Sequence, residues 1–338
     1  MKKIAINGFG RIGRLFFRQI FGHPEIKVVA INDLGEIDNL AYLLKYDSTY
    51  RSFEKNIKVE GGELVVGEQR IKILNEKNLL KLPWGDLNID VVVEATGVFT
   101  SFLKANYHIE AGAKRVVITA PAKDQDGVNN GKTVLMGVND KELNSTKLTC
   151  NGSCTTNAVG VVMSVMESEI GLEKAILNTI HGYTSSQSLV DSPKAGKFAR
   201  GRAAAQNIVL STTGAAIAVG RALPVLDKLF DGVATRVPVL AGSVADITFM
   251  AKRNTTVKEV NDILERASHN PIYKNVLKVV SDPIVSSDII GEPYGSVVDL
   301  NFTRVVGGDL VKIMAWYDNE WGYVSTLVNH VLHIKTQP

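Results

Sequence analysis

The chain has 338 residues, of which 45% are hydrophobic and 22% are charged, and a formal net charge of +3. This composition is typical of a globular protein, and the length allows two domains. The small net charge, with no run of Lys and Arg among aromatic residues, argues against nucleic acid as the main partner.

The N-terminal stretch MKKIAINGFG predicts a β-strand rather than a secretory signal, because its apolar run ends at Asn7 after three residues. Residues 148–166 carry no charge but are rich in Asn, Ser and Thr, which makes them a poor membrane span. We therefore expect a cytoplasmic protein without a membrane segment. In that compartment cysteines are more often free thiols than disulfides.

A glycine motif follows the first predicted strand. Residues 2–7 are apolar, residues 8–13 read GFGRIG, and apolar residues then recur at helical spacing. In this strand–turn–helix context GxGxxG predicts a dinucleotide-binding loop. Gly8, Gly10 and Gly13 would let a pyrophosphate approach the backbone at the start of the helix.

An acidic residue follows the second predicted strand, residues 26–32. Asp33 lies 20 residues after Gly13, which is the spacing expected for a carboxylate that binds the adenosine ribose. Because a carboxylate there would repel a 2′-phosphate, the sequence predicts NAD rather than NADP as the cofactor.

Further apolar runs suit interior strands of a mainly parallel sheet, and they cover residues 90–97, 114–120 and 133–139. Helical patterns separate strands in this half of the chain. The alternation predicts an α/β fold with a Rossmann-type, doubly wound, mainly parallel sheet.

Both cysteines lie in the stretch CNGSCTTNAVG, residues 150–160, and none of the six histidines is near it in sequence. A metal site would need more ligands. A disulfide between Cys150 and Cys154 would need both side chains to turn together at a strand-to-helix junction. We therefore expect no metal site and no disulfide.

Cys154 is expected at the start of a helix over residues 155–170, where the helix dipole and free amides lower the pKa of a thiol. Cys150 ends a strand and is expected to be packed. A reactive thiol needs a base, and His181, at the end of a strand predicted over residues 174–184, is the best candidate. The pattern predicts Cys154 as a nucleophile and His181 as its base.

Longer strand patterns with few helices between them dominate after Cys154. Besides residues 174–184 they cover residues 231–240, 243–252, 295–305 and 309–318. They predict a second, α+β domain with a mostly antiparallel sheet. Residues 185–202 have no clear period and predict a long functional loop, and residues 322–334 predict a terminal helix.

These motifs resemble those of phosphorylating glyceraldehyde-3-phosphate dehydrogenases over nearly the whole chain. The matching stretches are INGFGRIGR (6–14), AINDL (30–34), LLKYDS (43–48), EATGVF (94–99), SCTTN (153–157), STTGAA (211–216), RVPV (236–239) and WYDNEWGY (316–323). The most specific of them is SCTTN followed by a histidine in the context TIH.

The resemblance implies that the Cys154 thiolate attacks an aldehyde, that a hydride passes to NAD, and that inorganic phosphate releases an acyl phosphate. It implies D-glyceraldehyde 3-phosphate as the substrate and His181 as acid and base. The implied anion-binding residues are Ser153, Thr155, Thr184, Arg200, Thr213, Gly214 and Arg236. The implied cofactor-binding residues are Asn7, Gly8, Gly10, Arg11, Ile12, Gly13, Asn32, Asp33, Lys77, Thr96, Gly97, Thr119 and Asn319.

The resemblance also implies a domain organisation and an assembly. Residues 1–153 would form an NAD-binding domain, completed by a C-terminal helix at about 319–338, and residues 154–318 a catalytic domain. The loop at about 182–205 would pack between the subunits of a homotetramer. Lys77 stands where many relatives carry Arg.

Two alternative functions remain open at this point. Erythrose-4-phosphate dehydrogenase has the same architecture but usually departs from the TTG triplet, which is intact here at Thr212, Thr213 and Gly214. A non-catalytic binding role, for example with RNA, is disfavoured by the near-neutral charge and by the complete set of catalytic residues.

Overall fold

A computed structural model describes residues 1–335, which fold into two compact units. Unit 1 contains Met1–Val134, Asp140–Gly152 and the chain from Leu327, and unit 2 contains Leu135–Asn139 and Ser153–Thr326. Relative to the predicted boundaries, unit 2 gains residues 135–139, Ser153 and residues 319–326.

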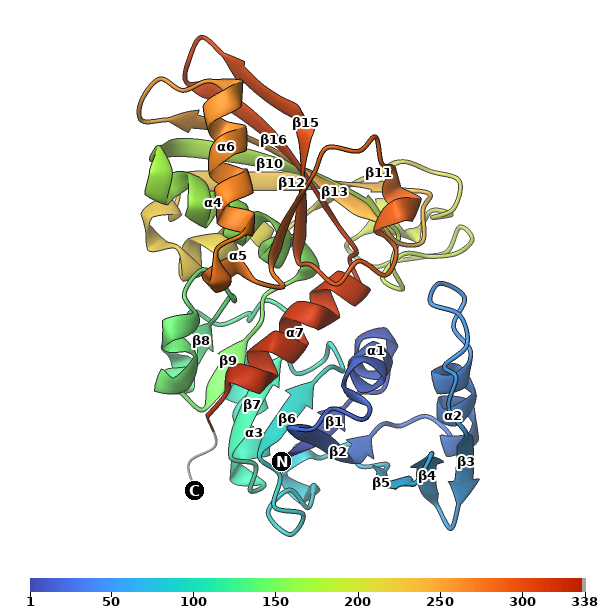
Figure 1. The fold of residues 1–338 in the computed structure, drawn as a ribbon. Coiled ribbons are helices and arrows are strands. Elements are labelled where there is room, and N and C mark those ends of the chain that lie inside the picture. The colour runs from blue at the N-terminus through green and yellow to red at the C-terminus, as the bar shows by residue number, and fades with distance from the viewer. Residues whose placement is uncertain (336–338) are drawn as a thin grey trace. The chain divides into compact units, whose positions relative to one another are not determined.

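Unit 1 is built on a nine-stranded sheet with the order β3-β4-β5-β2-β1-β6-β7-β9-β8 (Figure 1). The strands are β1 (Lys2–Asn7), β2 (Ile26–Asn32), β3 (Ile57–Glu60), β4 (Glu63–Val66), β5 (Gln69–Leu74), β6 (Val91–Glu94), β7 (Arg115–Ile118), β8 (Lys132–Thr133) and β9 (Leu148–Cys150). Across the sheet, every neighbouring pair from β5 through β2, β1, β6, β7 and β9 to β8 is parallel. Only the β3–β4 and β4–β5 pairs are antiparallel. The predicted Rossmann-type sheet is confirmed.

The central strands of this sheet are buried on both faces, which explains their continuous apolar sequences. In β6, Val91, Val92 and Val93 are all fully buried. Trp84 and Phe102 belong to the same buried cluster as Val92.

Three helices belong wholly to unit 1. They are α1 (Arg11–Ile20), α2 (Ile37–Lys45) and α3 (Phe102–Glu110). The helix α1 packs on β2, α2 on β3, and α3 on β7 and β9. The last helix, α7 (Trp321–His333), begins in unit 2 and continues in unit 1 from Leu327.

The strand predicted over residues 133–139 is wrong beyond its first residue. The strand β8 ends at Thr133, and the chain then turns, with the amides of Val138 and Asn139 bonded to the carbonyl of Leu135 at 3.1 and 3.2 Å. The side-chain oxygen of Asn139 in turn accepts the amide of Leu135 at 2.9 Å. The apolar residues here fill the interior without pairing as a strand.

Unit 2 is built on a seven-stranded sheet with the order β11-β12-β10-β13-β16-β15-β14. The strands are β10 (Leu172–Gly182), β11 (Val209–Thr212), β12 (Phe230–Val237), β13 (Ser243–Ala251), β14 (Leu277–Val280), β15 (Ser296–Val306) and β16 (Leu310–Tyr317). Only the β10–β12 and β14–β15 pairs are parallel. The prediction of a mostly antiparallel sheet is therefore confirmed.

One layer of helices covers this second sheet. The helix α4 (Cys154–Glu169) packs on β10, β13, β15 and β16, and it contacts both α5 (Ala215–Ala222) and α6 (Val257–Ser268) (Figure 1). Elsewhere in unit 2 apolar side chains remain exposed, such as Ile176 on β10 and Val233 on β12.

The loop predicted over residues 185–202 is irregular apart from a short 3-10 turn at Phe198–Gly201. Phe198 is 82% exposed, and Leu189 and Val190 on the same loop are also exposed. A long loop that holds this much apolar surface in water is unusual unless another surface covers it.

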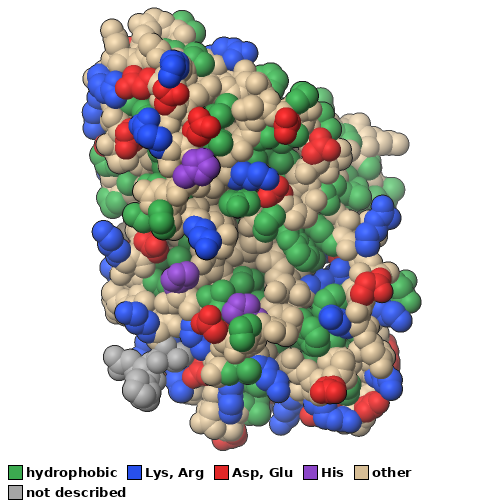
Figure 2. All heavy atoms as spheres, viewed as in Figure 1, with side chains coloured by type: hydrophobic (Ala, Val, Ile, Leu, Met, Phe, Trp, Pro, Cys, Tyr) green, Lys and Arg blue, Asp and Glu red, His purple; other side chains and the backbone are tan. Residues whose placement is uncertain are grey.

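Among residues 1–335, no helix combines the length and apolar character needed to cross a membrane. Acidic and basic side chains are interspersed over the face shown in Figure 2, as the small net charge suggests.

Candidate functional site

The glycine motif of unit 1 forms a tight turn between β1 and α1. Gly8 has φ +95°, and a Cβ atom there would lie 2.6 Å from the amide nitrogen of Thr96. A Cβ at Gly13 would collide with the carbonyl oxygen of Gly8, whereas one at Gly10 would meet nothing within 4 Å. Gly8 and Gly13 thus close the turn, and Gly10 leaves the start of α1 open to a ligand, which fits a pyrophosphate.

A cavity of about 380 Å³ lies at the carboxyl ends of the parallel strands. Most of the residues predicted around the dinucleotide line it. They are Asn7, Gly8, Gly10, Asn32, Asp33, Lys77 and Thr96. Cavities at this edge of a doubly wound sheet bind nucleotides, so the residues fit the predicted cofactor.

Asp33 is held at the end of β2 by backbone amides. Its Oδ2 accepts the amide of Phe9 at 2.6 Å, and its Oδ1 accepts the amide of Gly35 at 2.8 Å. These bonds fix the carboxylate against the glycine turn, and each oxygen keeps a lone pair for a ribose hydroxyl.

The remaining predicted cofactor residues of unit 1 lie outside the lining of the cavity. Arg11 forms an ion pair with Asp47 and stacks over the ring of Tyr50. Thr119 binds the carbonyl oxygen of Glu94 through both its amide and its hydroxyl, each at 3.0 Å. Ile12 is partly buried within α1, and Gly97 is exposed with φ +71°.

A buried carboxylate behind the cavity was not predicted. Glu94, at the end of β6, accepts the side-chain amide of Asn7 at 2.5 Å and the backbone amide of Thr96 at 2.9 Å. His108 Nδ1 accepts the indole N–H of Trp84 at 2.9 Å, so its Nε2–H donates to Glu94 at 3.0 Å. This series of hydrogen bonds positions Asn7 and Thr96. The only sign of it in the sequence is an acidic residue that ends an otherwise apolar strand.

In unit 2, Cys154 is the first residue of α4, as predicted. The preceding residue, Ser153, caps the helix, because its hydroxyl accepts the amide of Thr156 at 3.1 Å. The amides of the first turn are therefore directed toward the sulfur of Cys154 and the space beside it.

His181 lies one residue before the end of β10 and faces Cys154. Its Nε2 is 3.4 Å from Cys154 Sγ, and the residue is 4% exposed. The ring of Tyr317 packs edge-on against the imidazole, with the ring centres 5.9 Å apart. The structure thus brings together the two residues that the sequence predicts as nucleophile and base.

Arg236 lies beside His181 because β10 and β12 are parallel neighbours in which these two residues pair directly. Nδ1 of His181 is 2.6 Å from both Arg236 Nη1 and the carbonyl oxygen of Gly182. A protonated Nδ1 donates to Gly182 and leaves Nε2 free to accept the thiol proton. An unprotonated Nδ1 instead accepts a hydrogen bond from Arg236 Nη1, and the hydrogen on Nε2 then faces the sulfur.

The charges at this site are strongly affected by burial. Dense protein around the partly exposed Cys154 raises the pKa of its thiol, although the charge of Arg236 and the bonds to Thr155 act in the opposite direction. Burial, and then the charge of Arg236, lower the pKa of His181 to about 3. The predicted lowering of the thiol pKa is therefore wrong, because desolvation outweighs the helix start.

Cys150 has a different environment in unit 1. It is fully buried, it ends β9, and its thiol contacts the hydroxyl of Thr133 at 3.3 Å. Burial raises its pKa as well. Both cysteines are free thiols, and no cluster of potential metal ligands occurs in the part of the chain that the structure describes.

The predicted anion-binding residues of unit 2 present hydroxyls and guanidinium groups. Thr155 and Thr179 bind the hydroxyl of Tyr317 at 2.8 and 2.6 Å, a link that the sequence did not indicate. The hydroxyl of Thr184 contacts that of Ser186 at 2.8 Å. Arg236 buries its Nε without a hydrogen-bond partner in the described chain, which leaves a cationic donor for a bound anion.

The other predicted residues of unit 2 have partners of their own. Arg200 donates from Nε to the hydroxyl of Ser211 at 2.7 Å. The hydroxyl of Thr213 accepts the amide of Ala215 at 3.2 Å, and Gly214 precedes the first turn of α5. Asn319 accepts the hydroxyl of Ser243 through its side-chain oxygen at 2.9 Å.

A glycine turn followed by a carboxylate at the end of the second parallel strand, together with a helix-start cysteine paired to a histidine, is typical of NAD-dependent oxidoreductases. Residues 2–102 match the family model of the NAD binding domain of glyceraldehyde 3-phosphate dehydrogenase. Residues 153–319 match the model of its C-terminal domain. The chain belongs to the glyceraldehyde-3-phosphate dehydrogenase family, as the motifs suggested.

Curated relatives are similar over nearly their full length. Glyceraldehyde-3-phosphate dehydrogenase 2 of Streptomyces arenae is 44% identical over 330 residues, which cover 97% of this chain and 96% of the relative. The glyceraldehyde-3-phosphate dehydrogenase of Clostridium pasteurianum is 44% identical over 333 residues, with 97% of each chain covered. That of Borreliella burgdorferi is 44% identical over 334 residues, with 97% and 98% covered.

Proposed function

We propose that the chain is an NAD-dependent, phosphorylating glyceraldehyde-3-phosphate dehydrogenase of glycolysis and gluconeogenesis. It would oxidise D-glyceraldehyde 3-phosphate with inorganic phosphate to 1,3-bisphosphoglycerate. The observation that carries the proposal is the 3.4 Å approach of Cys154 Sγ to His181 Nε2 at the start of α4. Family membership supplies the substrate class.

The first step forms a bond between the Cys154 sulfur and the aldehyde carbon. As the sulfur attacks, His181 Nε2 takes the thiol proton, because this nitrogen lies 3.4 Å from the sulfur and accepts a proton when Nδ1 carries the ring hydrogen. The carbonyl π bond breaks, and the proton passes from Nε2 to the oxygen to give a thiohemiacetal. The amides at the start of α4 stabilise the developing negative charge.

The second step oxidises the thiohemiacetal to a thioester. NAD, when bound, supplies the acceptor for the hydride that leaves the carbon. His181 Nε2 removes the hydroxyl proton as the carbonyl reforms. An oxygen of inorganic phosphate then attacks the thioester carbon, the carbon–sulfur bond breaks, and the sulfur regains a proton from His181.

The reaction holds two anions, the phosphate of the substrate and the phosphate that attacks. We assign them to Ser153, Thr155, Thr184, Arg200, Thr213, Gly214 and Arg236. Arg236 is the strongest of these candidates, because its guanidinium lies beside His181 and its buried Nε lacks a partner in the described chain.

Unit 1 would be the NAD-binding domain and unit 2 the catalytic domain, with Asn319 contributing to the nicotinamide site. A cytoplasmic homotetramer is part of the same proposal. Two free cysteines suit a reducing compartment. The exposed apolar side chains of Phe198, Ile208 and Leu210 offer the loop and β11 a surface that other subunits would cover.

The test compares kcat/KM for phosphorylated three- and four-carbon aldehydes at fixed NAD and phosphate. The absorbance of NADH measures the rate. We expect a higher kcat/KM for D-glyceraldehyde 3-phosphate. A higher kcat/KM for erythrose 4-phosphate would establish the sister activity instead, and no NADH with either aldehyde would favour a non-catalytic role.

Replacing Asp33 with Asn should narrow the preference for NAD over NADP by about tenfold, because the variant loses the charge that repels a 2′-phosphate. The amide keeps an acceptor oxygen for the bonds from Phe9 or Gly35. The measurement is the ratio of kcat/KM for the two cofactors. Asp38→Asn, an exposed acid on α2, is the matched control and should leave the ratio unchanged. Equal use of both cofactors by the unmodified protein would contradict the ribose role of Asp33.

A further inference from the structure

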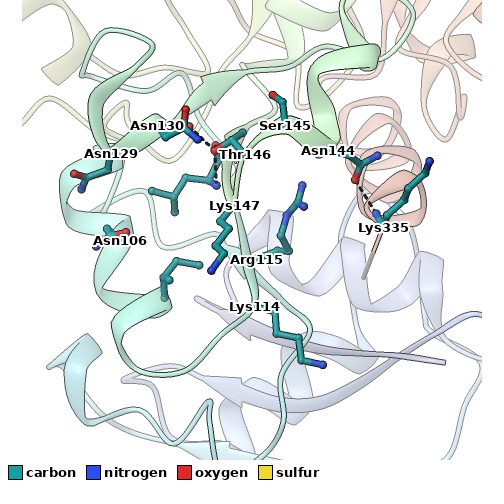
Figure 3. A pocket seen from close by; sticks show the side chains of 12 residues that line it. Asn106, Lys114, Arg115, Asn129, Asn130, Asn144, Ser145, Thr146, Lys147 and Lys335 are labelled. Carbon is teal, nitrogen blue, oxygen red and sulfur yellow. Dashed lines mark hydrogen bonds between the residues drawn. The ribbon is translucent and has the colours of Figure 1, made fainter. Parts of the chain in front are cut away.

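A second cavity in unit 1, of about 610 Å³, lies near the amino ends of β7 and β9 (Figure 3). The glycine turn and Asp33 lie at the carboxyl ends of the same parallel strands. The two cavities share no lining residue. This volume is within the range that small-molecule ligands occupy in proteins, and neither the cofactor nor the aldehyde chemistry requires it.

Arg115 and Lys147 both line this cavity. Val116 on β7 pairs with Leu148 on β9, and its amide binds the carbonyl of Lys147, so the preceding residues Arg115 and Lys147 are neighbours across the two strands. Figure 3 shows both side chains at the cavity. Like charges on neighbouring strands destabilise a sheet, and a bound anion would remove that cost.

The acidic residues around the cavity are each paired, and two of their partners, Lys114 and Asn106, line the cavity. Asp90 binds Lys114 at 2.8 Å, Glu142 binds Lys132 at 2.7 Å, and Glu110 accepts the side-chain amide of Asn106 at 2.8 Å. No Asp or Glu is among the residues that line the cavity. Within residues 1–335, Arg115 has one side-chain bond, to the carbonyl of Leu143 at 2.6 Å, and Lys147 has none. The cavity therefore keeps an excess of positive charge.

Asparagine side chains line the same cavity. Asn129 and Asn130 are held in the left-handed conformation, with φ 48° and 57°. Asn144 is fixed by bonds to the backbone of His333 and Lys335. An amide offers a donor and an acceptor together, the pattern that the edges of nucleobases present, and the side chain of Ile109 adds an apolar contact.

We propose that this cavity binds a nucleoside di- or triphosphate, with Arg115 and Lys147 on the phosphates and Asn129 and Asn130 on the base. The site is separate from the reaction and from the dinucleotide cavity. Its ligand is distinct from the substrates of the proposed reaction, since the cavity shares no lining residue with the dinucleotide cavity and contains neither Cys154 nor His181.

The test is isothermal titration calorimetry of the full chain with ADP, carried out at saturating NAD so that the dinucleotide site is filled. We expect saturable binding of ADP, and weaker binding of tripolyphosphate and of adenosine, each of which lacks half of the recognised groups. Loss of the ADP signal when NAD is saturating would show that ADP binds only at the dinucleotide site, and the proposal would fall.

Substitutions locate the site. Lys147→Gln should weaken ADP binding about tenfold, the effect of removing one charge-assisted hydrogen bond, and it should not disturb the fold because Lys147 makes no side-chain bond in the described chain. Lys72→Gln, the same change at an exposed position on β5, is the matched control and should leave binding unchanged. Equal affinity of both variants would overturn the assignment.

A second variant tests the nucleoside part of the proposal separately. Asn129→Gly keeps the left-handed backbone and removes the amide. It should reduce the preference for ADP over tripolyphosphate while leaving tripolyphosphate binding intact. If tripolyphosphate binds the unmodified protein as tightly as ADP does, the amides do not read a base and the nucleoside assignment is wrong.

Discussion

Without inorganic phosphate, the protein should produce one burst of NADH per active site and then turn over only by slow hydrolysis. The thioester on Cys154 needs an attacking anion, and water is a poor substitute in a site lined by groups that bind phosphate. Stopped-flow absorbance of NADH measures the burst. Arsenate should restore steady turnover without accumulation of an acyl phosphate, because acyl arsenates hydrolyse quickly. Steady turnover at full rate with water alone would mark a hydrolytic aldehyde dehydrogenase and contradict the anion sites.

Arg236→Ala should lower kcat/KM for the aldehyde by about two orders of magnitude and raise the phosphate concentration needed for half-maximal rate. A guanidinium that is bound to an anion in a buried site contributes several kcal/mol. Arg236→Lys should rescue the activity only in part, because an ammonium cannot make the forked contact. Arg221→Ala is a useful comparison, since Arg221 lies in the last turn of α5 and is outside the proposed anion sites.

Replacing Cys154 with Ser should reduce turnover by about 10⁴-fold or more, whereas Cys150→Ser should retain most of it. Removing the nucleophile of a covalent mechanism has effects of this size. Cys150 is fully buried and its thiol contacts the hydroxyl of Thr133, so substrate has no access to it. The measurement is steady-state formation of NADH.

Limiting iodoacetamide followed by mass spectrometry gives an independent readout of the same assignment. Cys154 should carry the label first. His181→Asn should slow the labelling of Cys154, since the imidazole that accepts the thiol proton is lost. Preferential labelling of Cys150, or full activity of Cys154→Ser, would show that the nucleophile is assigned to the wrong residue.

The parts of the site that could be predicted depend on local signals. Gly8 and Gly13 are needed by the backbone of a single turn, Gly10 leaves the start of α1 open, and Cys154 follows a capping serine at a helix start. Each signal is complete within a few residues. The pairing of Cys154 with His181 was predicted because chemistry demands a base, and the structure gives the distance that the sequence could not.

Other contacts depend on residues far apart in the chain and carry no local signal. Glu94 meets His108 and Asn7 only once β1, β6 and α3 have assembled. Tyr317 joins Thr155 to Thr179 across three elements. The thiol pKa of Cys154 was predicted in the wrong direction for the same reason, because burial is a property of the folded surroundings and the helix start alone was visible.

The fold was predicted best where strands are long and buried on both faces. The antiparallel extension formed by β3, β4 and β5 was not predicted. Its strands are short and partly exposed, so they lack the continuous apolar sequence of a buried strand. The strand predicted over residues 133–139 was wrong because these residues are buried but do not form a strand beyond Thr133. Their apolar sequence reflects burial, and burial in a turn leaves the same composition as burial in a strand.

The direct pairing of His181 with Arg236 on neighbouring strands has a consequence for how this protein tolerates changes in its length. The two residues are 55 positions apart in sequence, yet backbone pairing of β10 with β12 holds them, and the connecting chain does not. Gly196 is exposed, and a Cβ atom added there would meet nothing within 4 Å. Insertions near this residue should therefore leave His181 and Arg236 in register. New chain termini opened there by circular permutation should do the same. The register that places the guanidinium beside the imidazole therefore does not depend on the length of the chain between the two strands.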